Sequence, residues 1–421
     1  MISIYKPYLL ILSIFCSTFS FGQGAFDVVE PAHIKTVTLR PLKPDQHAPI
    51  LRLGETFRLS FDDLEADQKY YYYKIDHFDY NWNPSGLSPR EFIKGYDGDR
   101  IRDEQNSFNT LQFYTHYSVD FPNRNTQLKL SGNYMISILD ENDYVVFTRR
   151  FVLYEPQVNV SVSAHRSREI EHLDTKQNIQ FTINHTGLNI NNPKQEIKTV
   201  IMQNGNWETA VINLPPQYMR GNELIYKYLD ATNFWGGNEF LYFDSKAVKF
   251  ANIYIKRVEY GPVLYHTILY TNGERRNLPY TLFQDINGNY LVRNVDGRQG
   301  ESHIDADYTW VFFSLQTTQD LTGKRVFVNG AFNNWQNNGF NEMIYNPETG
   351  LYEIQILMKQ GFYNYQFVTL DQNLQFSNYD IDGSFFQTEN DYQVLVYYRP
   401  FGSRYDRVIG YGQVSSRRIL N

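Results

Sequence analysis

The sequence predicts an all-β protein built from tandem β-sandwich domains. Apolar and polar residues alternate along most of the 421-residue chain, which is the pattern of half-buried strands. Aromatic residues make up 16% of the chain, and they favour strands over helices. Strand-like segments recur about every 8 to 15 residues with turn signals between them, as in β-sandwiches.

The first residues have the features of an export signal. Lys6 supplies a positive charge, residues 9–19 form an apolar stretch, and small residues surround a cleavage site before Gln23. We predict that residues 1–22 are a signal peptide; a buried N-terminal strand is the alternative. Cys16, the one cysteine, follows Phe15 rather than a small residue, which argues against a lipid anchor.

Charge and hydropathy exclude two classes of partner. The formal net charge of −7 repels phosphate backbones, so we do not expect nucleic-acid binding. After the signal, no segment reaches the length of about 20 apolar residues that a membrane-spanning helix needs. We therefore expect a mature chain without a membrane span.

The chain is too long for one hydrophobic core, so two or three domains are expected. The pair Glu155-Pro156 interrupts the alternation, because proline cannot donate to a central strand ladder. We predict an N-terminal β-sandwich over 23–156, a middle β-sandwich over 157–304 and a C-terminal one over 305–421.

The segment 69–88 contains more aromatic residues than a soluble protein would expose. Strand alternation places Tyr71, Tyr73 and Ile75 on one face, and we assign that face to a sandwich core. The following loop, 80–87, is the better interface candidate. Its candidate partner-binding residues are Trp82, Pro84, Ser85 and Leu87.

Catalytic motifs are absent from the sequence. The histidines are dispersed, and neither a nucleophile elbow nor a glycine-rich phosphate loop occurs. Asp76 and Asp79 are a candidate pair of catalytic carboxylates, but a solvated strand face explains these two residues equally well. Residues 285–289 resemble the start of a calcium loop, but Gly288 is misplaced for one, and Asn-Gly favours a hairpin turn. We predict no enzyme activity, no cofactor and no metal.

The C-terminal domain resembles early-set immunoglobulin-like domains, which include glycogen- and starch-binding modules. The resemblance rests on residues 324–335, 343–354 and 359–367. It implies an immunoglobulin-like fold and, as an alternative function, carbohydrate binding through Trp335, Lys359 and Asn364. Structural aromatic residues in the core of the sandwich are the competing interpretation.

Nearly the whole mature chain resembles the plug protein family of the bacterial type IX secretion system. Ordered matches carry the resemblance: Tyr71, Tyr73, Ile75, His77, Asp79, Trp82, Ser85, Leu87, residues 131–134, 149–151, 233–234, 236–240, 243–244, 285–288 and 307–308, Val311, Phe313, and residues 396–399 and 404–406. The resemblance implies a non-catalytic periplasmic plug. Such a protein would bind the outer-membrane translocon barrel of this system and close its periplasmic opening.

Overall fold

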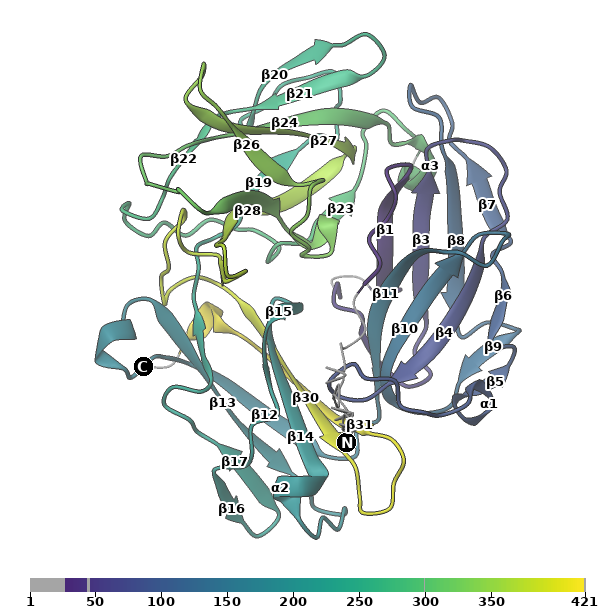
Figure 1. Ribbon diagram of the computed structural model, residues 1–421, viewed down its shortest axis with the longest axis vertical. Coiled ribbons are helices and arrows are strands. Elements are labelled where there is room, and N and C mark those ends of the chain that lie inside the picture. The colour runs from purple at the N-terminus through teal and green to yellow at the C-terminus, as the bar shows by residue number, and fades with distance from the viewer. Residues whose placement is uncertain (1–26, 44–45, 299, 420–421) are drawn as a thin grey trace, which may run out of the picture.

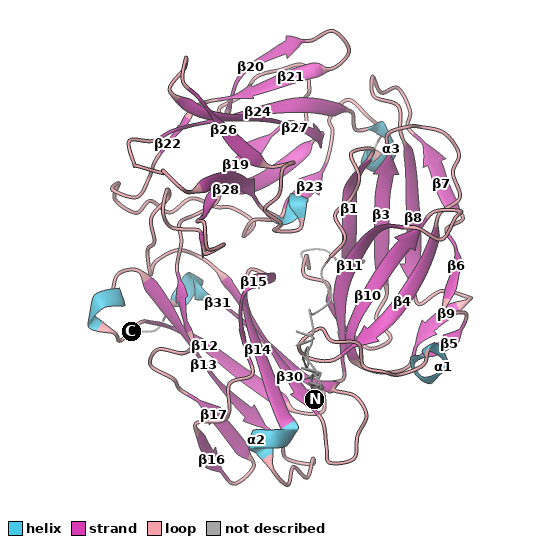
Figure 2. Ribbon diagram, in the orientation of Figure 1, coloured by secondary structure: helices cyan, strands magenta, loops and turns pink. Residues whose placement is uncertain are grey.

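The computed structural model describes residues 27–43, 46–298 and 300–419. Strands account for 47% of the described residues and helices for 5%, so the prediction of a mostly-β protein is confirmed (Figure 2). The immunoglobulin-like character of the individual domains stays a prediction. The predicted signal peptide lies outside the described residues. Among the described helices, none has the length and apolar character needed to span a membrane.

The first structural unit consists of two sheets that face each other over one core (Figure 1). One sheet has the order β1-β3-β8-β7 and the other β2-β11-β10-β4-β6, while β5 pairs with β9. Its elements are β1 (Ile34–Pro41), β2 (Ile50–Arg52), β3 (Phe57–Asp63), β4 (Tyr72–Phe78), α1 (Pro89–Phe92), β5 (Ile93–Gly95), β6 (Gly98–Arg100), β7 (Asp103–Asn106), β8 (Thr115–Phe121), β9 (Thr126–Leu128), β10 (Gly132–Leu139) and β11 (Val145–Tyr154).

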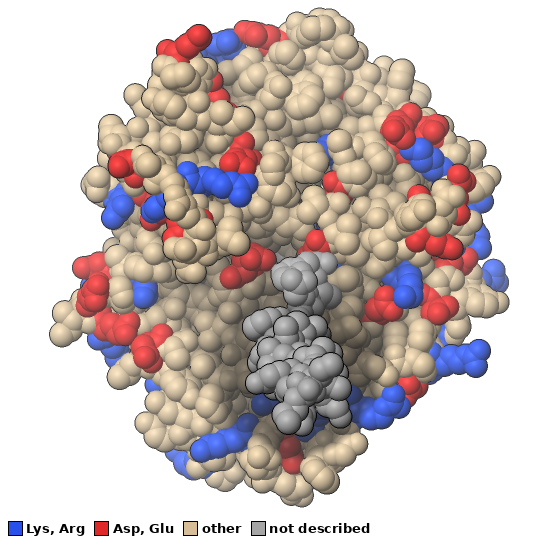
Figure 3. Space-filling model, in the orientation of Figure 1, with Lys and Arg blue, Asp and Glu red and all other residues tan. Residues whose placement is uncertain are grey.

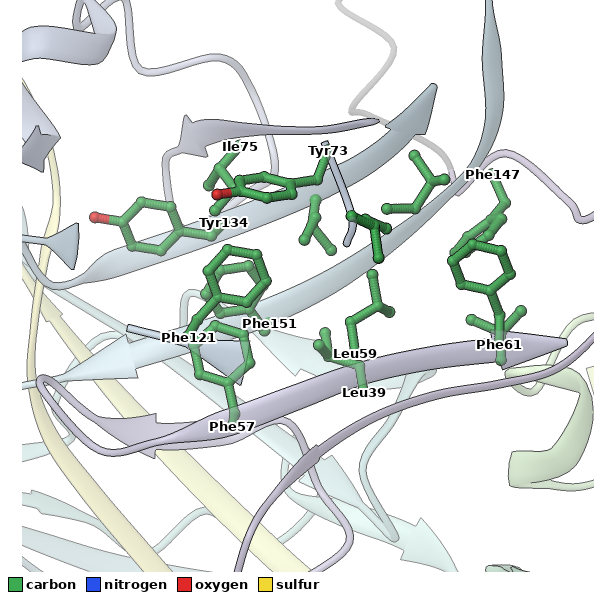
Figure 4. Close-up of a cluster of buried hydrophobic side chains, with 14 of the residues drawn as sticks. Leu39, Phe57, Leu59, Phe61, Tyr73, Ile75, Phe121, Tyr134, Phe147 and Phe151 are labelled. Atoms are coloured by element: carbon green, nitrogen blue, oxygen red, sulfur yellow. The ribbon is translucent and has the colours of Figure 1, made fainter. Parts of the chain in front are cut away.

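Aromatic side chains fill the core of the first unit (Figure 4). Tyr71 and Tyr73 are 2% exposed and Ile75 is fully buried, which confirms their assignment to the core. The Phe121 ring meets the Tyr73 ring edge-on, and the Phe57 ring packs against both Phe121 and Phe151. Burial of such large apolar side chains is the main source of stability, at about 25 cal/mol per Å² of area removed from water.

The second unit combines strands from the middle of the chain with strands from its end. One sheet has the order β12-β13-β17-β16, with β18 beside β13, and the other has the order β15-β14-β30-β31. The elements are β12 (Asn159–Arg166), η1 (Ile170–His172), β13 (Lys176–Asn184), α2 (Pro193–Glu196), β14 (Ile197–Gln203), β15 (Asn206–Ile212), β16 (Tyr218–Arg220), β17 (Glu223–Tyr226), β18 (Asn233–Trp235), β30 (Asp391–Tyr398), β31 (Arg407–Ser415) and η3 (Ser416–Arg418).

The third unit is one strongly curved 11-stranded sheet, nearly barrel-shaped. Its main order is β19-β28-β25-β26-β27-β24-β21-β20. The elements are β19 (Leu241–Asp244), β20 (Ile255–Tyr260), β21 (Tyr265–Leu269), β22 (Asn272–Gly273), β23 (Tyr290–Val292), α3 (Ser302–Asp305), β24 (Tyr308–Gln316), β25 (Arg325–Asn329), η2 (Ala331–Asn333), β26 (Glu342–Asn346), β27 (Leu351–Lys359), β28 (Gly361–Leu370) and β29 (Phe376–Ser377).

Strand pairing does not run in chain order between the second and third units. The predicted middle domain, 157–304, contributes β19 to β23 to the sheet that also holds β24 to β29. The predicted C-terminal domain, 305–421, contributes β30 and β31 to the sheet of β14 and β15. The domain boundaries remain a prediction. Residues 157–304 and residues 305–421 both contribute strands to each of these two sheets.

Candidate docking surface

Trp82, the central residue of the predicted interface loop, is buried inside the molecule. It is 5% exposed, and its ring meets Trp207 of the second unit edge-on at 5.0 Å. The Arg150 guanidinium lies 4.8 Å from the centre of its ring. Trp82 therefore joins two parts of the same chain, and the expectation that it is exposed in a loop is wrong.

The rest of the loop reaches the surface. Pro84 is exposed, whereas Ser85 and Leu87 are half-buried. The Ser85 amide donates to the His77 carbonyl at 3.1 Å. The loop then enters the one-turn helix α1, where the Ser88 amide donates to the Glu91 carboxylate at 2.8 Å, as in a capping box. These contacts fix the backbone of the segment. Its role in partner binding stays a prediction.

A second loop, between β30 and β31, is held equally firmly. The Arg399 side chain donates to the carbonyls of Ser403, at 3.3 Å, and Arg404, at 3.1 Å. The Ser403 amide donates to the Pro400 carbonyl at 2.9 Å. Phe401 stands at the tip of this braced turn and is 100% exposed.

The two loops form one surface. The Arg404 guanidinium donates to the Glu91 carboxylate at 2.8 Å and to the Gly86 carbonyl at 3.1 Å. The Asp406 carboxylate accepts from the Tyr80 amide at 3.1 Å, and burial raises the pKa of this carboxyl group. We call residues 84–91 and 399–405 the docking surface.

Positive charge gathers around the docking surface. Arg90 and Arg399 are exposed, and neither forms an ion pair among the described residues. Lys194, in the helix α2, lies nearby because the Arg399 amide donates to the Glu196 carbonyl at 2.8 Å. Figure 3 shows Lys and Arg side chains along the corresponding lower end of the molecule. This end combines an exposed aromatic tip with local positive charge on an acidic chain.

The residues of the predicted sugar site are not assembled into one exposed site. The Lys359 side chain is 1% exposed and pairs with the buried Asp62 at 2.6 Å. Asn364 is fully buried, and its side-chain oxygen accepts from the amides of Ile286, at 2.6 Å, and Gly288, at 3.3 Å. Trp335 and Lys359 line different cavities, so the three residues do not share one site. Lys359 is too enclosed to contact a sugar.

One group of potential metal ligands exists among the described residues. Ligand atoms of His33, Asp63 and Glu65 lie within 4.8 Å of one another. Lys69 already occupies the position of a cation there, because its ammonium group lies 3.0 Å from the Asp63 carboxylate and also pairs with Glu65. The arrangement is an ion-pair network.

Sequence reasoning missed Phe401 as a candidate contact residue. Its only sequence signal is its position in a short Pro-Phe-Gly turn between two strand-like segments. A phenylalanine in such a turn can fold back onto the core as readily as it can point outward. Only the three-dimensional brace by Arg399 and Arg404 distinguishes the two outcomes.

Comparison with solved structures reveals a close relative over nearly the whole chain. A crystal structure of a hypothetical protein from Parabacteroides merdae superimposes with a TM-score of 0.90 at 32% identity, covering 93% of this chain and 100% of the other. The BSP domain of a biofilm-associated protein also matches, at 8% identity over 93% of this chain and 61% of the other, but its TM-score of 0.18 is too low to indicate a shared fold. No curated protein matches.

Three packed β units position the docking surface at one end of the molecule. Residues 34–155 match the family model described as the type 9 secretion system plug protein 1st domain. The chain belongs to the type 9 secretion system plug protein family. Family membership implies a role in type IX secretion and a location in the cell envelope.

Proposed function

We propose that this protein is a periplasmic plug that binds the outer-membrane translocon of the type IX secretion system and closes its periplasmic opening without catalysis. Family membership supports this role. A plug must be bulky and must keep its shape under load. Three packed β units joined by buried contacts meet this requirement.

The docking surface is the part of the molecule that we propose contacts the translocon. Phe401 is the observation that carries this assignment, because it is the most exposed large apolar side chain among the described residues and stands on a braced loop beside exposed arginines. Aromatic and arginine side chains are enriched among residues that dominate binding energy. Arg399 and Arg404 hold Phe401 in place before binding, which lowers the entropy cost of association.

The test is co-purification of the translocon barrel with variants of this protein. We expect Phe401→Ala to weaken the complex by about 2 kcal/mol, roughly thirtyfold in Kd. The variant leaves folding intact because the side chain touches no core. Tyr144→Ala is the matched control, since Tyr144 is 72% exposed on the hairpin between β10 and β11.

Two results would contradict the proposal. A barrel that never co-purifies with the unaltered protein, in several detergents, would refute the plug function itself. Co-purification with both variants at equal strength would leave the plug function standing and refute the docking surface.

A further inference from the structure

A large cavity lies between the three units and away from the docking surface. Its volume is about 840 Å³, within the range of about 300 to 1,000 Å³ that is typical of ligand sites. The lining comes from all three units: from β1 and β11 of the first, from β15 and β31 of the second, and from residues 287–290 and 331–338 of the third. In Figure 3 the surface is hollowed between the units near the centre of the view.

Side-chain amides dominate the polar lining of this cavity. Eleven of its lining residues are Asn or Gln. Several of these side-chain amides form a hydrogen bond through only one of their two polar groups. The Gln393 oxygen accepts from the Gly205 amide at 3.0 Å, and the Asn337 oxygen accepts from Asn329 at 2.9 Å. Among the described residues, the NH₂ groups of Gln393 and Asn337 have no hydrogen-bond partner.

Other amides leave their oxygen atoms unused. The Asn289 NH₂ group donates to the Ile286 carbonyl at 2.9 Å, and the Asn287 NH₂ group donates to Asp391 at 2.8 Å. The Asn287 oxygen is buried without a hydrogen-bond partner in the described part of the chain. The cavity therefore offers both fixed donors and fixed acceptors.

The charged residues that line the cavity are largely neutralised within the protein. Arg149 pairs with Glu30, Arg150 lies 3.3 Å from Asp27, and Arg325 lies 2.9 Å from Glu342. The Arg40 guanidinium stacks on the Tyr290 ring at 4.5 Å. A charged ligand would have to compete with these contacts, whereas a neutral polar ligand would not.

Half-buried aromatic rings complete the lining. Trp335 stands on left-handed backbone, with φ of +60° directly after +54° at Asn334, which is uncommon for residues other than glycine. Trp207 is backed by Trp82, and Tyr411 is backed by Tyr154 at 5.2 Å. The negative face of such a ring attracts the weakly positive C–H groups of a sugar ring.

We propose that this cavity binds a short neutral oligosaccharide. Sugar hydroxyl groups both donate and accept hydrogen bonds, so they can pair with the free NH₂ groups and with the free oxygen atoms of the lining amides. The C–H faces of sugar rings pack on Trp335 and Trp207. An extended peptide is the less suitable ligand, because peptides are captured mainly by backbone groups at strand edges. Here the polar groups are side-chain amides. The site is independent of the plug function and differs from the predicted sugar site in all but Trp335.

The test is titration calorimetry of the purified protein with short neutral oligosaccharides built on glucose, mannose, galactose and N-acetylglucosamine. We expect saturable binding of at least one of them. Trp335→Ala should weaken that binding about tenfold by removal of a stacking face. Gln413→Met should weaken it about threefold, and Tyr144→Ala should leave it unchanged.

Gln413 keeps the proposal testable if Trp335→Ala does not fold. It is exposed on β31 and lines the cavity, and within the described part of the chain its oxygen accepts only from the Tyr411 hydroxyl, at 2.9 Å. Absence of binding to every oligosaccharide would overturn the proposal. So would binding that neither cavity variant weakens, or an unstructured peptide that binds in the cavity where no oligosaccharide does.

Discussion

Two of the contacts that the first unit makes with the rest of the molecule differ in kind. Against the third unit, it presents the buried carboxylate of Asp62, which contacts Lys359 and Tyr308 of that unit, each at 2.6 Å. His116, within the first unit, contacts the same carboxylate at 2.6 Å. Against the second unit, it presents an apolar cluster, in which Ile50 and Val152 pack with Val200, Leu395 and other side chains.

This difference predicts how each contact responds to the loss of a partner and to small shifts in structure. A buried ion pair stabilises only while every partner is in place, because an unpaired charge in the interior is very unfavourable. Apolar surfaces have no such directional requirement and adapt to small shifts. We therefore expect the contact with the third unit to fix the geometry of the molecule, and the contact with the second to supply stability that falls off gradually.

The largest expected effect comes from removing the cation of the buried pair. Lys359→Met leaves the Asp62 carboxylate buried without its main counter-ion, and should lower the free energy of unfolding by about 3 to 5 kcal/mol. Denaturant unfolding measures the loss. Arg58→Met is the matched control, because the Arg58–Asp120 pair is exposed and should contribute at most about 1 kcal/mol. Equal losses in the two variants would refute the special role of the buried pair.

The pH dependence of stability should separate the two contacts. Burial lowers the pKa of His77 to about 4, and its ring packs on Tyr405 of the docking surface at 5.6 Å. The unfolded chain binds a proton at this histidine below about pH 6.5, whereas the folded chain does so only near pH 4. Stability is therefore lost as the pH falls through this window, by up to about 3 kcal/mol.

Asp62 should respond only at lower pH. Burial would raise the pKa of its carboxyl group, but Lys359 and His116 outweigh burial and hold the pKa below its ordinary value. Its contribution is present above about pH 4 and is lost below that. Unfolding measured at a series of pH values, with His77→Gln as the comparison, checks both statements. The same slope between pH 4 and 6.5 in the two proteins would contradict the role of His77.

The smallest expected effect is at the apolar contact. Trp207→Ala removes the ring that meets Trp82 edge-on and should cost about 1 to 2 kcal/mol, since Trp207 is only half-buried. Trp207→Phe keeps an aromatic ring and should lose less than half as much. Thermal unfolding measures both variants. A loss from Trp207→Ala as large as that from Lys359→Met would show that the two contacts do not differ as described.

The local features of the fold could be predicted from the sequence. Alternation identified the buried face of Tyr71, Tyr73 and Ile75. The Asn287-Gly288 turn has the expected positive φ at both residues. However, no described strand leads directly into this turn, so the turn does not connect the two strands of a hairpin. Turn chemistry is local, whereas strand pairing is not.

Features that depend on contacts between distant segments could not be predicted. Trp82 is buried by Trp207, and Lys359 by Asp62, and in both cases the partner is far away in the sequence. Phe401 is exposed because Arg404 ties its loop to Gly86. Periodicity shows which face of a strand is apolar, but not which other unit will cover it.

The interleaved strand order also determines when the protein can finish folding. β14 has one of its two neighbours, β30, almost 200 residues later in the chain. Until β30 and β31 emerge, β14 exposes an open strand edge, and the second unit cannot close its core. A partly synthesised chain thus remains incompletely folded.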